Sequence, residues 1–193
     1  MKYQETGRLG RITKSLRKKG FEKHLENILF DSADFNNLNE KTKVGYIETV
    51  VNRMEKEIGE ESTKTVLFSC GEQCCGKSWT TFAMNIWNSS NSLENFFINL
   101  NNEEEKYNTN FSFKEDIKTV YVMRSKCIWG LINKGNFSNN KNLFCTCSNG
   151  HMTDFFNSIF SVKEVLLEQS ISSGADKCKW RIELNNWGNK IDN

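Results

Sequence analysis

Apolar side chains within residues 39–61 recur at the spacing of an α-helix. They follow one another at steps of three and four positions, and Gly59 stands where such a helix would end. The residues concerned are Val44, Ile47, Val51, Met54 and Ile58. We therefore predict a helix here, with one face in the core.

Residues 7–30 carry a second helical pattern, with a narrower apolar face and a strongly basic one. The apolar residues are Ile12, Leu16, Leu25 and Ile28, and the basic residues are Arg8, Arg11, Lys14, Arg17, Lys18, Lys19 and Lys23. This pattern is typical of a docked helix whose charged face lies in solvent. An arm that contacts nucleic acid or another anionic partner stays open as the alternative.

The last part of the chain alternates with the period of a β-strand. In residues 177–184 one face carries Cys178, Trp180, Ile182 and Leu184, and the other carries charged residues. Residues 163–171 predict the preceding strand, because the Gly-containing segment 172–176 has the length of a hairpin loop. Cys178 is therefore expected to point into the core.

The middle of the chain has a less regular pattern. Residues 88–116 are rich in Asn, Ser and Glu and predict a long loop with one helical turn. Residues 117–132 alternate like a strand, and residues 133–142 form a turn region before a second strand over 143–147. A short helix is predicted over residues 153–160.

Consecutive strands with short links indicate an antiparallel sheet. We therefore predict an α+β fold in which helices pack on one side of that sheet. Residues 1–38 are treated as a basic helical extension, and residues 39–193 as a single α+β ligand-binding domain.

Composition limits the function classes. The 193 residues have a net charge of +2, too small by itself to indicate a nucleic-acid partner. The chain carries neither a signal-peptide pattern nor a run of about 18 apolar residues, so we expect a cytoplasmic protein that does not contact a membrane. Its seven cysteines are then expected to be thiols, metal ligands or catalytic groups rather than disulfides.

The segment FSCGEQCCGKSW, Phe68 to Trp79, contains the phosphate-loop spacing G-x-x-x-x-G-K-[ST] between Gly71 and Ser78. A phosphate loop needs a preceding strand and a second strand that ends in a magnesium-binding Asp. No Asp of this chain stands in that position. We therefore favour a helix, in which Cys70 and Cys74 lie one turn apart on one face and form a thiol cluster with Cys75. A P-loop nucleotide-binding protein stays open as an alternative.

The other cysteines are spread over the second half. Cys145 and Cys147 would share one face of the strand predicted over residues 143–147, and Cys178 points inward from the last strand. Three thiolates with a carboxylate or an imidazole suit zinc. The alternative is that these residues are small buried hydrophobes, which we prefer for Cys127.

A resemblance supports the zinc hypothesis. The segments CTCSNGHMTDFFNSIF and VKEVLLEQSISSGADKCKWRIEL, residues 145–160 and 162–184, resemble the C-terminal part of 4-vinyl-reductase-like domains, which are bacterial small-molecule sensor modules. The resemblance implies a structural zinc held by three Cys and one Glu beside an apolar pocket. Carried over by position, Cys147 and Cys178 match the first and last ligands and Glu168 approximately the carboxylate. The remaining family cysteine falls near Ser170 or Ile171, so this sequence departs there, and Cys145 is the candidate replacement.

We therefore expect a sensor-type domain, with no catalytic residues, that binds a small apolar or aromatic ligand; a homodimer is compatible with this. The expected metal set is Cys145, Cys147, Glu168 and Cys178 with zinc, and the expected pocket residues are Trp129, Phe155, Phe156 and Trp180. The enzymatic alternative is a hydrolase of small cyclic amides or thiazolines, with Cys147 or Cys74 as nucleophile and His151 as base.

Overall fold

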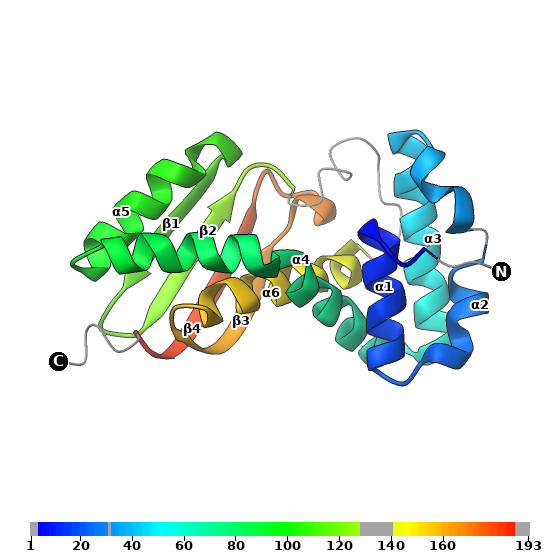
Figure 1. Cartoon of the computed structure of the whole chain (residues 1–193). Coiled ribbons are helices and arrows are strands. Elements are labelled where there is room, and N and C mark those ends of the chain that lie inside the picture. Colours follow the sequence, from blue (N-terminus) through cyan, green and yellow to red (C-terminus); the bar gives the residue numbers. More distant parts are fainter. Residues whose placement is uncertain (1–3, 31, 128–140, 188–193) are drawn as a thin grey trace.

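The first helices pack around one apolar core. The computed structural model describes residues 4–30, 32–127 and 141–187. Helices α1 (Gly7–Lys18), α2 (Leu25–Ile28) and α3 (Glu40–Ile58) share this core with the beginnings of two long helices, α4 (Glu60–Ser89) and α6 (Lys141–Asn157). Figure 1 shows α1 to α3 grouped at one end of the molecule and the sheet at the other. The core of the predicted extension is therefore continuous with the core that α3 and α4 build.

The predicted helices of this region are confirmed. The Asn39 side chain accepts a hydrogen bond from the Thr42 amide at 2.9 Å and begins α3, and Gly59, with a φ of 79°, ends it. In α1 the apolar face is buried, while the Lys14 and Lys18 side chains are exposed. Lys14, Arg17 and Lys18 thus lie on the outer face of a docked helix.

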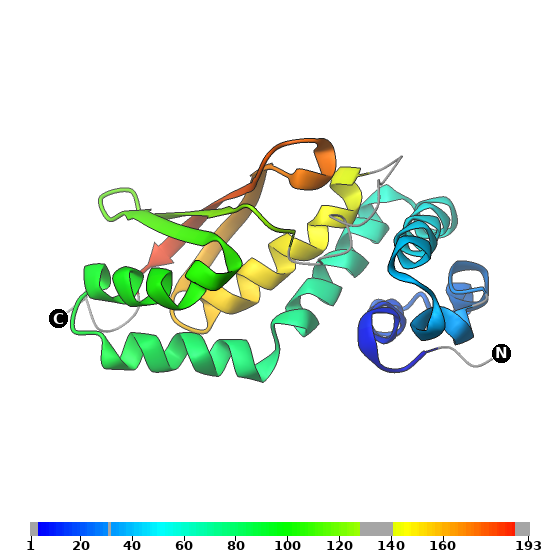
Figure 2. The same cartoon turned by 90° about the horizontal axis from the view of Figure 1, so that it is seen from above.

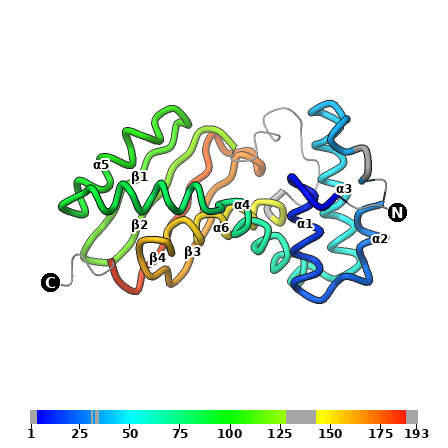
Figure 3. The backbone as a smooth tube through the Cα atoms, viewed as in Figure 1, coloured from blue at the N-terminus to red at the C-terminus, as the bar shows by residue number. Residues whose placement is uncertain are grey.

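Helices α4 and α6 run side by side from the first core to the sheet (Figure 3). Two glycines allow this close packing. A Cβ atom on Gly71 would lie 1.8 Å from the carbonyl oxygen of Cys147, and one on Gly150 would lie 2.0 Å from that of Phe68. At Gly76 (φ 63°, ψ 169°) α4 bends, and its second half turns under the sheet (Figure 2).

The sheet is antiparallel, with strand order β1-β2-β4-β3. The strands are β1 (Thr109–Lys114), β2 (Thr119–Arg124), β3 (Ser161–Gln169) and β4 (Cys178–Asn186). The second half of α4, α5 (Leu93–Glu104) and α6 cover one face of it (Figure 2). This arrangement confirms the α+β fold.

A second core fills the space between the sheet and these helices. It is largely aromatic: the Trp87 and Phe160 rings lie 5.2 Å apart, and the Phe96 ring lies 5.3 Å from Trp87, both edge to face. In β4 the buried positions alternate from Cys178 to Leu184, as the sequence pattern predicted. Strands β3 and β4 pair as the expected hairpin.

Two predictions about the middle of the chain are wrong. Residues 88–116 are not a long loop, because they contain α5 and β1. Ser92 accepts a hydrogen bond from the Asn95 amide at 3.1 Å and begins α5, whose Phe96, Phe97 and Leu100 are buried. The polar residues that suggested a loop are the outer face of that helix and the ends of the strand.

Residues 143–147 are not a strand either. They belong to α6, which also contains most of the short helix predicted over residues 153–160. Phe144 and Cys147, three positions apart, are both buried in the first core. The predicted strand over 117–132 is β2 for Thr119–Arg124, while residues 128–132 lie outside the described part. Within the described residues, no helix is long and apolar enough to cross a membrane.

Candidate functional site

The cysteines of the predicted metal set lie in different surroundings. Cys145 Sγ is 2.7 Å from Ser172 Oγ, and Cys178 Sγ accepts a hydrogen bond from the Ile171 amide at 3.4 Å. Both thiols therefore contact the short helical turn Ile171–Ser173. Burial is the main cause that raises the pKa of Cys145, to about 11, and also raises that of Cys178.

The remaining members of the set are placed elsewhere. Cys147 is buried in the first core, between the N-terminal helices and α4. The Glu168 carboxylate forms ion pairs with Lys179 Nζ at 3.1 Å and Arg181 Nε at 3.3 Å. The thiol that does come near Cys145 and Cys178 is Cys127, close enough for its charge to influence both.

Within the described residues, no group of three or more Cys, His, Asp or Glu side chains is arranged to hold a metal ion. The four predicted zinc ligands therefore do not form a tetrahedral set as they stand. Zinc binding stays a prediction for this chain.

The phosphate-loop segment is helical on both sides of the kink in α4. Gly71 to Cys75 precede the kink, and Lys77 and Ser78 follow it with exposed side chains. A helix thus takes the place of the strand that a phosphate loop requires, so the P-loop alternative loses its structural basis. The first glycine of the motif, Gly71, allows α4 to pack closely against α6.

Two thiols of the same segment, Cys70 and Cys75, have little nucleophilic character. Cys70 and Cys75 are buried, and burial is the main cause that raises each pKa to about 12. For Cys75 the neighbouring Asp154 carboxylate acts in the same direction. Cys74 is half-buried. All the cysteines among the described residues are free thiols.

Three of the predicted pocket residues belong to the second core. Phe156 and Trp180 are fully enclosed, and Phe155 is 4% exposed. Trp129 lies outside the described residues. Of the four, Phe155 also lines a chamber between the helices and the sheet.

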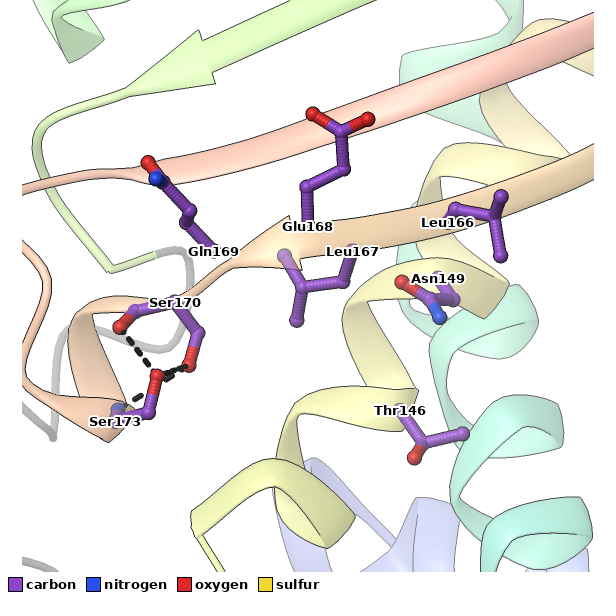
Figure 4. Close-up of a pocket in the computed structure, with 8 residues that line it drawn as sticks. All are labelled: Thr146, Asn149, Leu166, Leu167, Glu168, Gln169, Ser170 and Ser173. Atoms are coloured by element: carbon purple, nitrogen blue, oxygen red, sulfur yellow. Dashed lines mark hydrogen bonds between the residues drawn. The ribbon is translucent and has the colours of Figure 1, made fainter.

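An open groove of about 350 Å³ lies between α6 and the edge strand β3 (Figure 4). Thr146 and Asn149 project into it from the helix, and Ser170 and Ser173, bonded to each other at 2.7 Å, lie at its end. Its volume is within the range of small-molecule sites. Its lining is largely polar, so it does not fit the expected apolar pocket.

A smaller chamber lies between the helices and the sheet. Side chains from α4, α5, β1, β2 and α6 line it, and its volume is about 20 Å³, room for about one water. Its walls are aromatic and apolar, while its polar groups come from different elements. The lining residues are Trp79, Glu104, Thr109, Phe111, Arg124, His151, Met152 and Phe155.

The polar groups of the chamber are desolvated. Burial raises the pKa of Glu104, and the charge of Arg124 acts against this rise. Burial also lowers the pKa of His151 to about 4, with Arg124 as the second cause, so the imidazole is neutral at pH 7. The pKa of Arg124 is lowered by burial as well. Perturbed groups of this kind, gathered in one cavity, are typical of functional sites.

Some polar atoms of these groups lack a hydrogen bond of normal geometry. Among the described residues, Glu104 Oε1, Thr109 Oγ1 and His151 Nδ1 are buried without a hydrogen bond of normal length and angle. Glu104 and Thr109 are nevertheless close enough for the hydroxyl to favour the carboxylate form. Buried polar atoms normally have partners, so unpaired atoms that line one chamber suggest a site completed by water or ligand.

Of the residues that line the chamber, only His151 and Phe155 are site candidates by sequence. Glu104, Thr109 and Arg124 were missed because they lie in or beside the segment taken for a loop, or on a strand without a motif. One signal was present: Arg124 is a charged residue at the end of an otherwise apolar strand, TVYVMR.

Fold and site define an α+β domain with a buried polar chamber between its sheet and its helices. Comparison with known protein families places the chain by its sequence: residues 5–187 match the model described as "Family of unknown function (DUF6144)", so the chain belongs to that family. No curated protein and no solved structure matches it.

Proposed function

We propose that the chain is a cytoplasmic small-molecule-binding domain of the sensor type, and that the chamber around Arg124 and His151 recognises its ligand. The observation that carries this proposal is that three buried polar atoms without a hydrogen bond of normal geometry, on Glu104, Thr109 and His151, line one aromatic-walled cavity. A ligand that supplies those partners gains hydrogen bonds without further desolvation of the protein.

The position and walls of the chamber agree with a binding role. Ligand sites are concave and mostly apolar, with a few polar groups that orient the ligand. Trp79, Phe111 and Phe155 supply the aromatic surface, and the Trp79 ring lies 6.4 Å from His151, edge to face. At about 20 Å³ the chamber has room for about one water, so a ligand would reach it with a single polar group and lie mainly at its mouth.

The hydrolase alternative has less support. None of the described cysteines lines the chamber that contains His151. Cys147 is enclosed in the first core, where a substrate carbonyl could not reach it without opening the contact between α4 and α6.

A thermal-shift screen with small aromatic and lipid-like compounds tests the binding role. We expect compounds that raise the melting temperature of the wild type and raise it less in Thr109→Val, which removes a chamber hydroxyl from a strand position suited to Val. Ser173→Ala, in the open groove, is the matched control and should respond like the wild type. If no compound stabilises the protein, or if only Ser173→Ala abolishes the effect, the chamber is not the ligand site. Metal analysis of the same preparation tests the zinc prediction.

A further inference from the structure

The chamber contains a cation whose charge is incompletely paired. The Arg124 Nε donates a hydrogen bond to the Lys126 carbonyl at 3.0 Å, and its guanidinium carbon lies 5.4 Å from the centre of the Tyr107 ring. No ion pair between two described residues includes Arg124. The Glu104 carboxylate of the same chamber attracts this guanidinium without forming a direct ion pair with it. A partly desolvated guanidinium is a strong binding group for a planar anion such as a carboxylate.

The groups around Arg124 can add hydrogen bonds to the same anion. Thr109 donates through its hydroxyl, His151 through the Nδ1–H tautomer, and Glu104 only when it is protonated. Glu104 is 4% exposed and Thr109 is 5% exposed, so neither exchanges freely with water. A carboxylate has about four lone-pair positions, so it can accept hydrogen bonds from several of these side chains at once.

The aromatic wall indicates what such a carboxylate would be attached to. Phe111 and Phe155 line the enclosed part, while Trp79 is half-buried and Tyr107 is partly exposed. The rings of Trp79 and Tyr107 lie 6.0 Å apart. We take these two rings as the mouth of the chamber, where they would contact the apolar part of a ligand whose head group is inside.

We propose that the chamber binds the carboxylate group of a small aromatic acid, and that Glu104 takes up one proton from the solvent when this ligand binds. The proposal rests on the proposed function of the chamber as the ligand site. No covalent bond of the ligand changes: its oxygens accept hydrogen bonds from Arg124 and from the protonated Glu104.

The charges that face Glu104 fix the sign of the pH dependence. Arg124 on β2 and Lys106 after α5 favour its carboxylate form, while burial and Glu103 favour the protonated form, and the pKa of Glu104 is raised. His151 on α6 stays neutral above about pH 4. An anionic ligand adds to the effects that favour protonation. Affinity should therefore be constant below the pKa of the free protein's Glu104 and fall above it, by up to about tenfold per pH unit.

Calorimetric titration of the full chain with benzoate and phenylacetate, each beside its neutral amide, tests the proposal between pH 6 and pH 8. We expect the acids to bind at least about tenfold more tightly than the amides, since a charge-assisted hydrogen bond is lost with each amide. Buffers of different ionisation enthalpy should report the uptake of up to one proton in the part of this range where free Glu104 is ionised.

Three variants separate the roles. Arg124→Met should weaken acid binding by about ten- to hundredfold. Glu104→Gln keeps a donor of the same shape, so it should retain acid binding and lose the pH dependence and the proton uptake. Glu164→Gln, which removes an exposed carboxylate of β3 outside the chamber, is the control and should behave like the wild type.

Each result has a defined meaning. Amides that bind as tightly as the acids would overturn the carboxylate assignment while leaving a ligand site in place. An unchanged pH dependence in Glu104→Gln would overturn the role of Glu104. Absence of binding by the acids, the amides and every compound of the thermal-shift screen would overturn the proposed function as well. If Arg124→Met does not fold, the comparison of acids with amides still tests the carboxylate assignment, and Glu104→Gln still tests the role of Glu104.

Discussion

The substitution Gly71→Ala tests the close contact between α4 and α6. The added Cβ would lie 1.8 Å from the Cys147 carbonyl oxygen and 2.8 Å from both the Cys147 carbonyl carbon and the His151 amide nitrogen. All three are backbone atoms, so no side-chain rotation relieves the overlap. The helices must separate by at least about 1.2 Å to restore a contact of 3.0 Å.

Two effects of opposite sign determine how much Gly71→Ala changes the free energy of unfolding. Ala stabilises a helix by about 1 kcal/mol relative to Gly. Overpacking of a dense interior costs about 1–3 kcal/mol. The cost at Gly71 should lie at or above the upper end of this range, because the added Cβ would meet backbone atoms where α4 and α6 cross. We therefore expect Gly71→Ala to lower the free energy of unfolding by about 2 kcal/mol or more. For a chain of this size that loss corresponds to a melting temperature lower by about 4–8 °C.

Gly45→Ala is the matched control. Gly45 lies on the exposed face of α3, and an added Cβ would meet nothing within 4 Å. The same chemical change should therefore raise the unfolding free energy by about 0.5–1 kcal/mol. Urea denaturation followed by circular dichroism measures both variants under one condition. If Gly71→Ala is as stable as Gly45→Ala, the close crossing of α4 and α6 does not exist in solution.

Three further predictions concern single sites. Asn39→Ala should lower the unfolding free energy by about 1 kcal/mol in the same assay, because it removes the side-chain cap of α3. The unfolded chain binds a proton at His151 below about pH 6.5, whereas the folded chain does so only near pH 4, so stability should fall between these values as the pH falls. His151→Gln should remove up to about 3 kcal/mol of that loss in acid denaturation, and an unchanged profile would contradict the burial of the imidazole. Cys70 and Cys75 should resist iodoacetamide in the native protein and react in urea, as mass spectrometry would record, whereas rapid native alkylation would show that they are accessible.

The sequence predicted those elements in which local pattern and tertiary environment agree. Helix α3 has an apolar stripe, an Asn cap and a terminal Gly, and the hairpin of β3 and β4 has alternating positions around a short loop. The pattern was insufficient for α6. Over five residues, a two-residue alternation such as Cys145 and Cys147 does not distinguish a strand from a helix that is buried on several sides. The packing of α6 against α4, closest at Gly71 and Gly150, favours the helix.

The candidate site was harder to predict because its residues are distant in the chain. Glu104, Arg124 and His151 come from three elements, and nothing in their local sequence links them. Gly71 was noticed for a reason unrelated to its role: the glycine and lysine pattern suggested a phosphate loop, whereas the glycine is required by the neighbouring helix. A motif reports residue types at a spacing, and the partner that explains them can lie elsewhere.

The crossing and the chamber are also connected physically. A Cβ at Gly71 would meet the backbone of His151, and the His151 side chain lines the chamber. We therefore expect a separation of α4 from α6 at this point to displace the imidazole relative to Arg124 on β2. A ligand held by both groups would resist that movement, because it binds the native arrangement better than the separated one. Gly71→Ala should thus weaken ligand binding although it lies outside the chamber, and ligand should recover part of the stability that the substitution removes.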